Sequence, residues 1–318
     1  MKNKNRKRII SLVLCFSILL GIKHSYNIYM KKHPEKLFNL NSNDKIITMV
    51  DDDYDDLNII PALGSMVPQG IAMNDDYIFL SLYDSLKISR SMIYVFDLDF
   101  NLKRKVLLDS YSHVGGIAID EVNNCIWTSG TYGSVCAYSI DDILSKKEVN
   151  AFFKDNVVGE DLINYRGQRA VSFLTIDDSK LFVGNYTCID DGTLKVYDIC
   201  NENGKLSLEY ITNYSIPTMV QGVSFYAFDE QEYILFSRSC GEGVDSFVQM
   251  YKFDEKFDYH NTESVNFRLD PMLEQICVDD NGMLNGVFES NAVPYKGKDK
   301  ENDYRVFSLK KQLKKSDN

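Results

Sequence analysis

The 318-residue sequence is poor in several residue types, with six prolines, 18 glycines, four histidines and one tryptophan. So little proline and glycine, together with 44% hydrophobic residues, excludes a collagen-like or disordered chain. Two of the four histidines, His24 and His33, lie close after an N-terminal apolar run, which leaves too few for a multi-histidine metal centre. No C-x-x-C pair, P-loop, G-x-S-x-G or H-E-x-x-H motif occurs. We therefore expect no metal site and no bound cofactor, and we find no catalytic signature.

The charge is divided unevenly along the chain. Residues 1–38 contain nine basic residues and one acidic residue, a net charge of +8. The remaining 280 residues contain 26 basic and 45 acidic residues, a net charge of −19. Proteins bind nucleic acid largely by neutralising phosphates with Lys and Arg, so this acidic body excludes nucleic acid as an expected partner.

A short apolar run, residues 9–22 (IISLVLCFSILLGI), follows the basic start. This order is typical of an export signal. The run is shorter than the roughly 20 residues that span a bilayer, yet no small-x-small cleavage site follows it. We therefore expect residues 1–38 to form a cytoplasmic stub, a signal-anchor helix and a juxtamembrane linker, with the body outside the cell membrane. Cleavage after Gly21, which would release a secreted protein, and lipidation at Cys15 are the alternatives.

Six of the seven cysteines follow this run, and most lie in strand-like segments such as CIWTS and SVCAYSI. A cysteine in such a segment is usually a small buried hydrophobe. We therefore expect free, buried thiols, and up to three disulfides are the alternative.

Aromatic residues are abundant, at 12% of the chain, and they recur in five units of about fifty residues. Apolar strands open these units around Gly70, Gly116, Ser172, Gly222 and Gln275. An acidic or Asn-rich turn follows each, then a second apolar strand, a polar loop and a third strand. The first four units add a weaker fourth strand, such as KRKVLLD. Repeated antiparallel units of this kind predict an all-β protein, a β-propeller with five blades.

Closure of the predicted ring depends on its two ends. The fifth unit ends after its third strand, at Leu309, whereas spare strands precede the first unit at residues 45–50 (KIITMV) and near residues 57–60. An N-terminal strand that completes the last blade would leave no open sheet edge. We expect one propeller domain over residues 39–311 and a frayed basic tail over residues 312–318. The alternatives are six blades, with residues 39–66 in an extra blade, or a β-sandwich with a second domain.

A propeller brings the ends of its innermost strands to the mouths of a central channel, so polar residues at those ends are candidates for a site. The candidate ligand-binding residues are Gln69, His113, Arg169, Asn185, Gln221, Arg238 and Glu274. His113, Glu274 and Glu289 are also the candidate catalytic residues, because imidazole and carboxyl groups transfer protons. The alternative is that these polar side chains only hydrogen-bond the backbone between blades.

The segments PQGIAMNDDYIFLS, HVGGIAIDEVNNCIWTSG and LEQICVDDNGMLNGVFES resemble blades of bacterial surface and periplasmic propellers. That superfamily includes quinoprotein-like and gluconolactonase or strictosidine-synthase-like rings, and the resemblance covers most of residues 67–311. Gluconolactonase-like rings bind a divalent metal through a Glu, an Asn and an Asp. The resemblance implies the first two roles for Glu274 and Asn185, and it offers no matching Asp.

Together these features predict a membrane-anchored extracytoplasmic propeller that binds a protein, a glycan or a small molecule at its mouth. The alternative is a metal-dependent hydrolase or lactonase with a divalent cation in the channel.

Overall fold

The computed structural model describes residues 29–50, 53–57, 64–157, 162, 170–297 and 304–316. The apolar run at residues 9–22 and the candidate residue Arg169 lie outside these ranges. The chain divides into two compact units, Met1–Leu40 and Asn41–Asn318. The described part of the first unit contains the short helix α2 (Pro34–Leu37), which begins with a proline where a missing N–H costs nothing. None of the helices among the described residues has the length and apolar content needed to cross a membrane.

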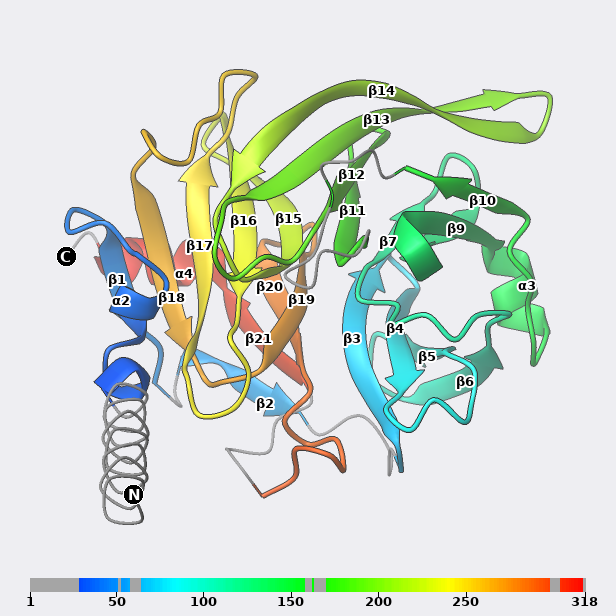
Figure 1. Ribbon diagram of the computed structural model, residues 1–318, viewed down its shortest axis with the longest axis horizontal. Coiled ribbons are helices and arrows are strands. Elements are labelled where there is room, and N and C mark those ends of the chain that lie inside the picture. The colour runs from blue at the N-terminus through cyan, green and yellow to red at the C-terminus, as the bar shows by residue number, and fades with distance from the viewer. Residues whose placement is uncertain are drawn as a thin grey trace, which may run out of the picture. The chain divides into compact units, whose positions relative to one another are not determined.

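The second unit is a five-blade β-propeller, which confirms the predicted fold class (Figure 1). Each blade is an antiparallel sheet whose first strand is innermost. Blade 1 contains β3 (Met66–Met73), β4 (Tyr77–Asp84), β5 (Met92–Asp97) and β6 (Leu102–Leu107), and blade 2 contains β7 (Ile117–Asp120), β8 (Cys125–Ser129), β9 (Ser134–Ser139) and β10 (Phe153–Asn156). Blade 3 contains β11 (Phe173–Asp177), β12 (Lys180–Gly184), β13 (Gly192–Glu202) and β14 (Lys205–Ile216). Blade 4 contains β15 (Val220–Phe228), β16 (Gln231–Arg238), β17 (Ser246–Lys252) and β18 (Ser264–Leu269), and blade 5 contains β19 (Leu273–Val278), β20 (Met283–Phe288) and β21 (Tyr304–Ser308).

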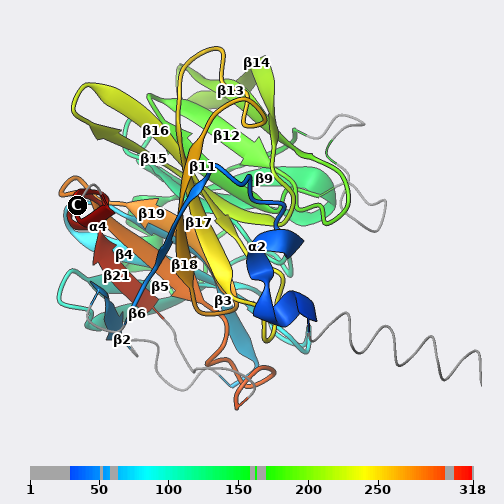
Figure 2. The same ribbon diagram turned by 90° about the vertical axis from the view of Figure 1, so that its left-hand side faces the viewer.

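Two N-terminal strands join existing blades. Strand β2 (Asp55–Leu57) pairs antiparallel with β21, with Asp55 opposite Val306, and completes blade 5. Strand β1 (Lys45–Thr48) pairs parallel with β18 and adds a fifth strand to the outside of blade 4 (Figures 1 and 2). The ring is therefore closed by residues 55–57 rather than by residues 45–50. The six-blade alternative is wrong, because neither segment forms a blade of its own.

The core lies between neighbouring blades. Phe79 and Ile93 of blade 1 pack with Ile126 and Tyr138 of blade 2, and all four are fully or almost fully buried. The central strands are covered on both faces, as the uninterrupted burial of β8 illustrates. Full burial of one such side chain contributes about 1.5–3 kcal/mol, so the blades are held together mainly by these layers.

The segment after β21 is ordered as a helix. Helix α4 (Leu309–Ser316) buries Leu309 and Gln312, and Leu313 packs against the core between blades 4 and 5. The expectation of a frayed basic tail is therefore wrong for residues 312–316. The six cysteines in the described ranges are free; Cys125 and Cys136 are buried, and the other four are half-buried.

Candidate functional site

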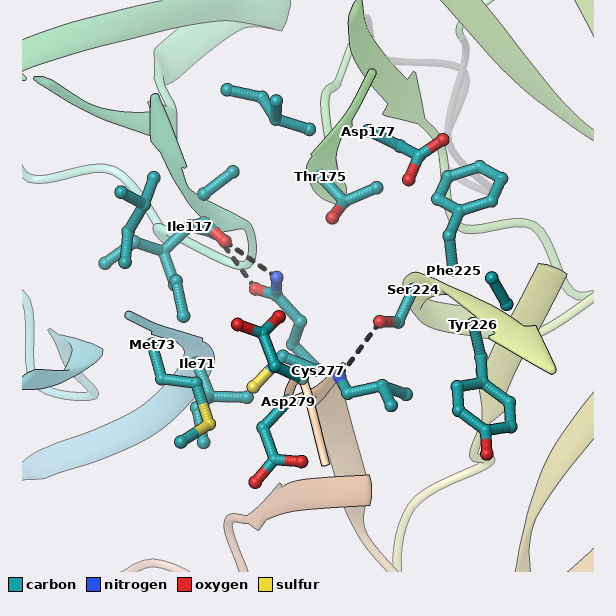
Figure 3. Close-up of a pocket in the computed structure, with 18 residues that line it drawn as sticks. Ile71, Met73, Ile117, Thr175, Asp177, Ser224, Phe225, Tyr226, Cys277 and Asp279 are labelled. Carbon is teal, nitrogen blue, oxygen red and sulfur yellow. Dashed lines mark hydrogen bonds between the residues drawn. The ribbon is translucent and has the colours of Figure 1, made fainter. Parts of the chain in front are cut away.

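The five innermost strands begin at one end of the central channel and finish at the other. We call these ends the amino-end mouth and the carboxyl-end mouth. A pocket of about 480 Å³ opens at the amino-end mouth and is lined by Gln69, His113, Gly115, Ala170, Val171, Ser172, Tyr186, Gln221, Cys240, Gly241 and Glu274. A second pocket of about 390 Å³ opens at the carboxyl-end mouth, and all five innermost strands contribute to it (Figure 3).

The side chain of Gln275 crosses the channel near the floor of the carboxyl-end pocket. Its Oε1 accepts a hydrogen bond from the Ile117 backbone N–H at 2.9 Å, and its Nε2 donates to the backbone oxygens of Ile117 (2.8 Å) and Leu174 (3.2 Å). The dashed lines at Ile117 in Figure 3 mark the first two of these bonds. Gln275 is 1% exposed, and its amide links blade 5 to blades 2 and 3.

Glycines at the equivalent positions of other blades leave room for this side chain. A Cβ atom on Gly70 would lie 2.7 Å from Gln275 Oε1, and one on Gly222 would lie 2.7 Å from Gln275 Cα. Real Cβ atoms do not approach other atoms so closely, so both positions require glycine. The repeat therefore uses four small residues and one glutamine at the same point of the ring.

The carboxyl-end pocket is polar at its rim and apolar at its wall. Ile71 and Met73 lie on one side in Figure 3, and Ser224 lies on the other, where its Oγ accepts a hydrogen bond from Val278 N–H at 3.1 Å. Burial, with a smaller contribution from Glu232, raises the pKa of Asp177 to about 6. Sequence reasoning missed this pocket, because the acidic residues that end these strands are also typical of tight turns.

The amino-end pocket collects most of the candidate ligand-binding residues. Gln69, His113, Gln221 and Glu274 line it, each from a different blade or the loop that enters one. The recurrence of polar residues just before or at the start of each innermost strand was the sequence signal for this grouping. The ligand-binding role of these residues stays a prediction.

Two carboxyl groups at this mouth are held close enough to affect each other. Glu274 is 5% exposed and its Oε1 accepts from Gln221 Nε2 at 3.1 Å; the half-buried Glu289 accepts from Gln69 Nε2 at 3.1 Å. Burial raises the pKa of Glu274 well above its usual value, and the negative charge of Glu289 raises it further. Burial also raises the pKa of Glu289, to about 7, although the Gln69 hydrogen bond opposes this shift. Both carboxyl groups therefore keep a proton to a higher pH than an ordinary glutamate does.

Aromatic rings form the wall above these carboxyl groups. The imidazole of His113 lies on the ring of Tyr83, with 4.0 Å between ring centroids, and the Tyr83 phenol is hydrogen-bonded to Tyr295. His113 keeps an accessible face at the mouth. The protein around its ring, and then the positive charge of Lys87, lower its pKa below the usual value, so the imidazole is neutral at pH 7.

The other two described candidates are held in hydrogen bonds and do not line the pocket. The Arg238 guanidinium donates to Thr218 O at 2.7 Å and to Gln249 Oε1 at 2.6 Å, while Asn185 Oδ1 accepts from Thr193 N–H at 2.8 Å. These contacts fit the alternative reading, in which polar residues satisfy the backbone within and between blades. Within the described ranges, no group of three His, Cys, Asp or Glu residues is placed to hold a metal ion.

Exposed apolar side chains surround the amino-end mouth. They lie in loops that connect strands at this end of the blades, and they are Leu86, Ile88, Tyr111, Tyr132, Ile189 and Val293. We call this set the apolar rim. Tyr132 is 89% exposed and Ile189 is 82% exposed, although large apolar side chains are normally covered. These exposed apolar side chains and the polar pocket lie on the same face of the ring, where both are available to a partner.

Comparison with protein families and with curated proteins finds no match. Solved structures of β-propellers are similar in fold. The β-propeller domain of Cps50 (Swd1) from Myceliophteria thermophila is 9% identical, with a TM-score of 0.38 over 76% of this chain and 83% of that one. The WD40 repeats of RRP9 are 7% identical, with a TM-score of 0.45 over 81% and 98% of the two chains, and U3-55K is 8% identical, with a TM-score of 0.45 over 84% and 100%. At these identities the likeness concerns the backbone and says nothing about ligands.

Proposed function

We propose that this protein is a binding module whose amino-end mouth takes up part of a protein partner. The observation that carries this proposal is the amino-end pocket, to which the blades contribute polar side chains around a cavity of about 480 Å³. Volumes of this size are usual for ligand sites. The apolar rim extends the same face outward, which favours a macromolecular partner over a small molecule that fills the pocket alone.

Photo-crosslinking from matched positions tests which face binds. Tyr132 and Val122 belong to the same blade and are 89% and 81% exposed, but Tyr132 lies between β8 and β9 at the amino-end face and Val122 lies at the opposite face. A photoreactive phenylalanine analogue at residue 132 of the full-length protein, in its native cells, is expected to yield a discrete protein adduct. The same analogue at residue 122 is expected to yield none. Equal labelling from both positions, or adducts from residue 122 alone, would contradict the proposal.

We also propose that residues 9–22 anchor the propeller to the membrane, with the propeller on the extracytoplasmic side. The support is the basic start and the apolar run of the sequence. After alkaline carbonate extraction, the full-length protein is expected to stay with the membranes, and a Leu14→Arg variant is expected to be released. Release of the unaltered full-length protein would contradict the anchor, and a shortened chain would indicate signal cleavage.

A hydrolase is the second candidate, favoured by the Glu274 and Glu289 pair beside His113. Two neighbouring carboxyl groups with raised pKa values could supply an acid and a base. The resemblance to gluconolactonase-like rings adds a divalent cation held by Glu274 to this candidate. Hydrolysis of esters or lactones by the purified protein should then be lost in Glu289→Gln and retained in Glu121→Gln, at an exposed acid on the opposite face. Activity that survives Glu289→Gln would contradict this role.

A further inference from the structure

We propose that the amino-end pocket binds a basic side chain, the ammonium of lysine or the guanidinium of arginine, presented by an apolar segment of a protein partner. This inference rests on the proposed function, because it names the chemistry that the binding face recognises.

Glu274 has a hydrogen-bond donor at only one of its two carboxyl oxygens among the described residues. This carboxylate is 5% exposed and lines the pocket, and among the described residues only Gln221 donates to it, at Oε1. Its second oxygen has no donor in the described part of the chain. That oxygen is not fully buried and stays accessible to a ligand, and a cation with N–H groups would satisfy both the charge and the hydrogen-bonding capacity of the carboxylate.

Three acidic residues, Glu242, Glu274 and Glu289, lie near one another at this mouth. The charge of the exposed Glu242 contributes to the raised pKa of Glu289, and the charge of Glu289 contributes to the raised pKa values of Glu274 and Tyr295. Lys87 lies near His113, and its positive charge contributes to the lowered pKa of that imidazole. A partner that brings a positive charge would therefore relieve the repulsion that keeps a proton on the pair. Electrostatic complementarity of this kind selects one partner chemistry over others.

Aromatic and apolar side chains lie around the pocket. Tyr83 and Tyr186 flank the pocket, and the apolar rim lies outside it. The methylene stem of a lysine or arginine covers such a surface while its charged end reaches the carboxylates. Aromatic faces also attract cations. Apolar residues on either side of the basic residue would cover rim side chains such as Tyr132 and Ile189.

The test uses the purified full-length protein and acetylated, amidated five-residue peptides with a central lysine, arginine or norleucine between leucines. Norleucine keeps the stem and removes the charge. In titration calorimetry the lysine or arginine peptide should bind at least about tenfold more tightly than the norleucine peptide at pH 8. Glu274→Gln should reduce this ratio to about threefold or less, whereas the matched control Glu121→Gln, at an exposed acid between β7 and β8 on the opposite face, should leave most of it.

Protonation supplies a second readout that does not depend on a variant. As the pH falls from about 8 to about 5, the carboxyl pair takes up protons, so the ratio between the basic and the norleucine peptides should fall. Equal affinities for charged and neutral peptides, or a ratio that Glu274→Gln leaves unchanged, would overturn the inference. If adducts form from residue 132 but no basic peptide is preferred, the proposal of a protein-binding amino-end face is supported, and the proposal that its pocket binds a basic side chain is wrong. If adducts do not form there either, both proposals fail.

Discussion

The side-chain amide of Gln275 pairs with both backbone polar atoms of Ile117, the N–H at 2.9 Å and the carbonyl oxygen at 2.8 Å. The amide acts here as one more peptide group added to β7. Because it comes from blade 5 and reaches blades 2 and 3, it connects parts of the ring that share no sheet.

Replacing Gln275 with leucine should destabilise the propeller strongly. Leucine keeps most of the volume but leaves the N–H and oxygen of Ile117 and the oxygen of Leu174 without this partner. Since each buried unsatisfied group costs about 1–3 kcal/mol, we expect a loss of about 2–5 kcal/mol in the free energy of unfolding in urea. The control Gln231→Leu, at a glutamine that donates only to the neighbouring Glu232 oxygen, should change it by less than about 0.5 kcal/mol.

Gly70→Ala should be destabilising because its Cβ has no space. The added atom would lie 2.5 Å from Ser81 Oγ and 2.7 Å from Gln275 Oε1. Overpacking of this kind costs about 1–3 kcal/mol. Thermal unfolding of Gly70→Ala, Gln275→Ala and the double variant measures the coupling, and the double variant should lose less than the sum of the two. If the stability losses of the two single variants add up to that of the double variant, Gly70 is not required to make room for Gln275.

Arg305 is expected to stabilise the closure of the ring. It is 1% exposed, donates to Asp270 Oδ2 at 2.7 Å, and its guanidinium lies 3.6 Å from the ring centroid of Tyr54, next to β2. Arg305→Met should lower the free energy of unfolding by about 3 kcal/mol, because it leaves a partly buried carboxylate without its cation. Arg268 forms a similar pair with Asp245 at 2.6 Å in a more exposed place, so Arg268→Met should cost less than about 1 kcal/mol. Equal losses would argue against a special role for Arg305.

The stability of the protein should depend on pH through Glu289. The pKa of this carboxyl group is about 7 in the folded protein and near 4.5 when unfolded, so the folded state binds more protons between these values. This group therefore favours folding at low pH, and its contribution is lost as the pH rises through about 7. Relative to Glu289→Gln, the unaltered protein should lose about 2 kcal/mol of stability between about pH 5 and pH 8. A constant difference across this range would show that Glu289 titrates normally.

Strand pattern and repeat spacing predicted the five blades, because each blade carries its own turns and apolar strands. They did not predict how the ring closes. The tetrapeptide KIIT of β1 fits the free edge of any blade, and β2 is a three-residue strand of sequence DDL with no apolar alternation. Both strands obtain their partners from residues more than 200 positions away.

The site shows the same division between local and long-range information. The recurring position at the start of each unit was visible in the sequence, and Gln69, Gln221 and Glu274 do reach one pocket. Arg238 also lay at a recurring position, but its guanidinium turns back to Thr218, which sequence spacing cannot indicate. Gln275 occupies the position at which the other units have glycine or serine. The sequence shows this difference, but only the structure shows that the five positions meet at the centre of the ring, where the glutamine side chain fills the space that the glycines leave.

The pairing of β2 with β21 also sets an order of events during synthesis. Strand β2 leaves the ribosome among the first parts of the propeller, whereas β21 is the last strand of the chain. In each of blades 1 to 4, four strands that follow one another in the sequence form the sheet. These blades can therefore fold one after another as they leave the ribosome. Blade 5 cannot be completed before residues 304–308 have been synthesised, so a nascent protein carries an open sheet edge until that point. Chaperone contact and premature self-association should therefore concentrate on this last blade.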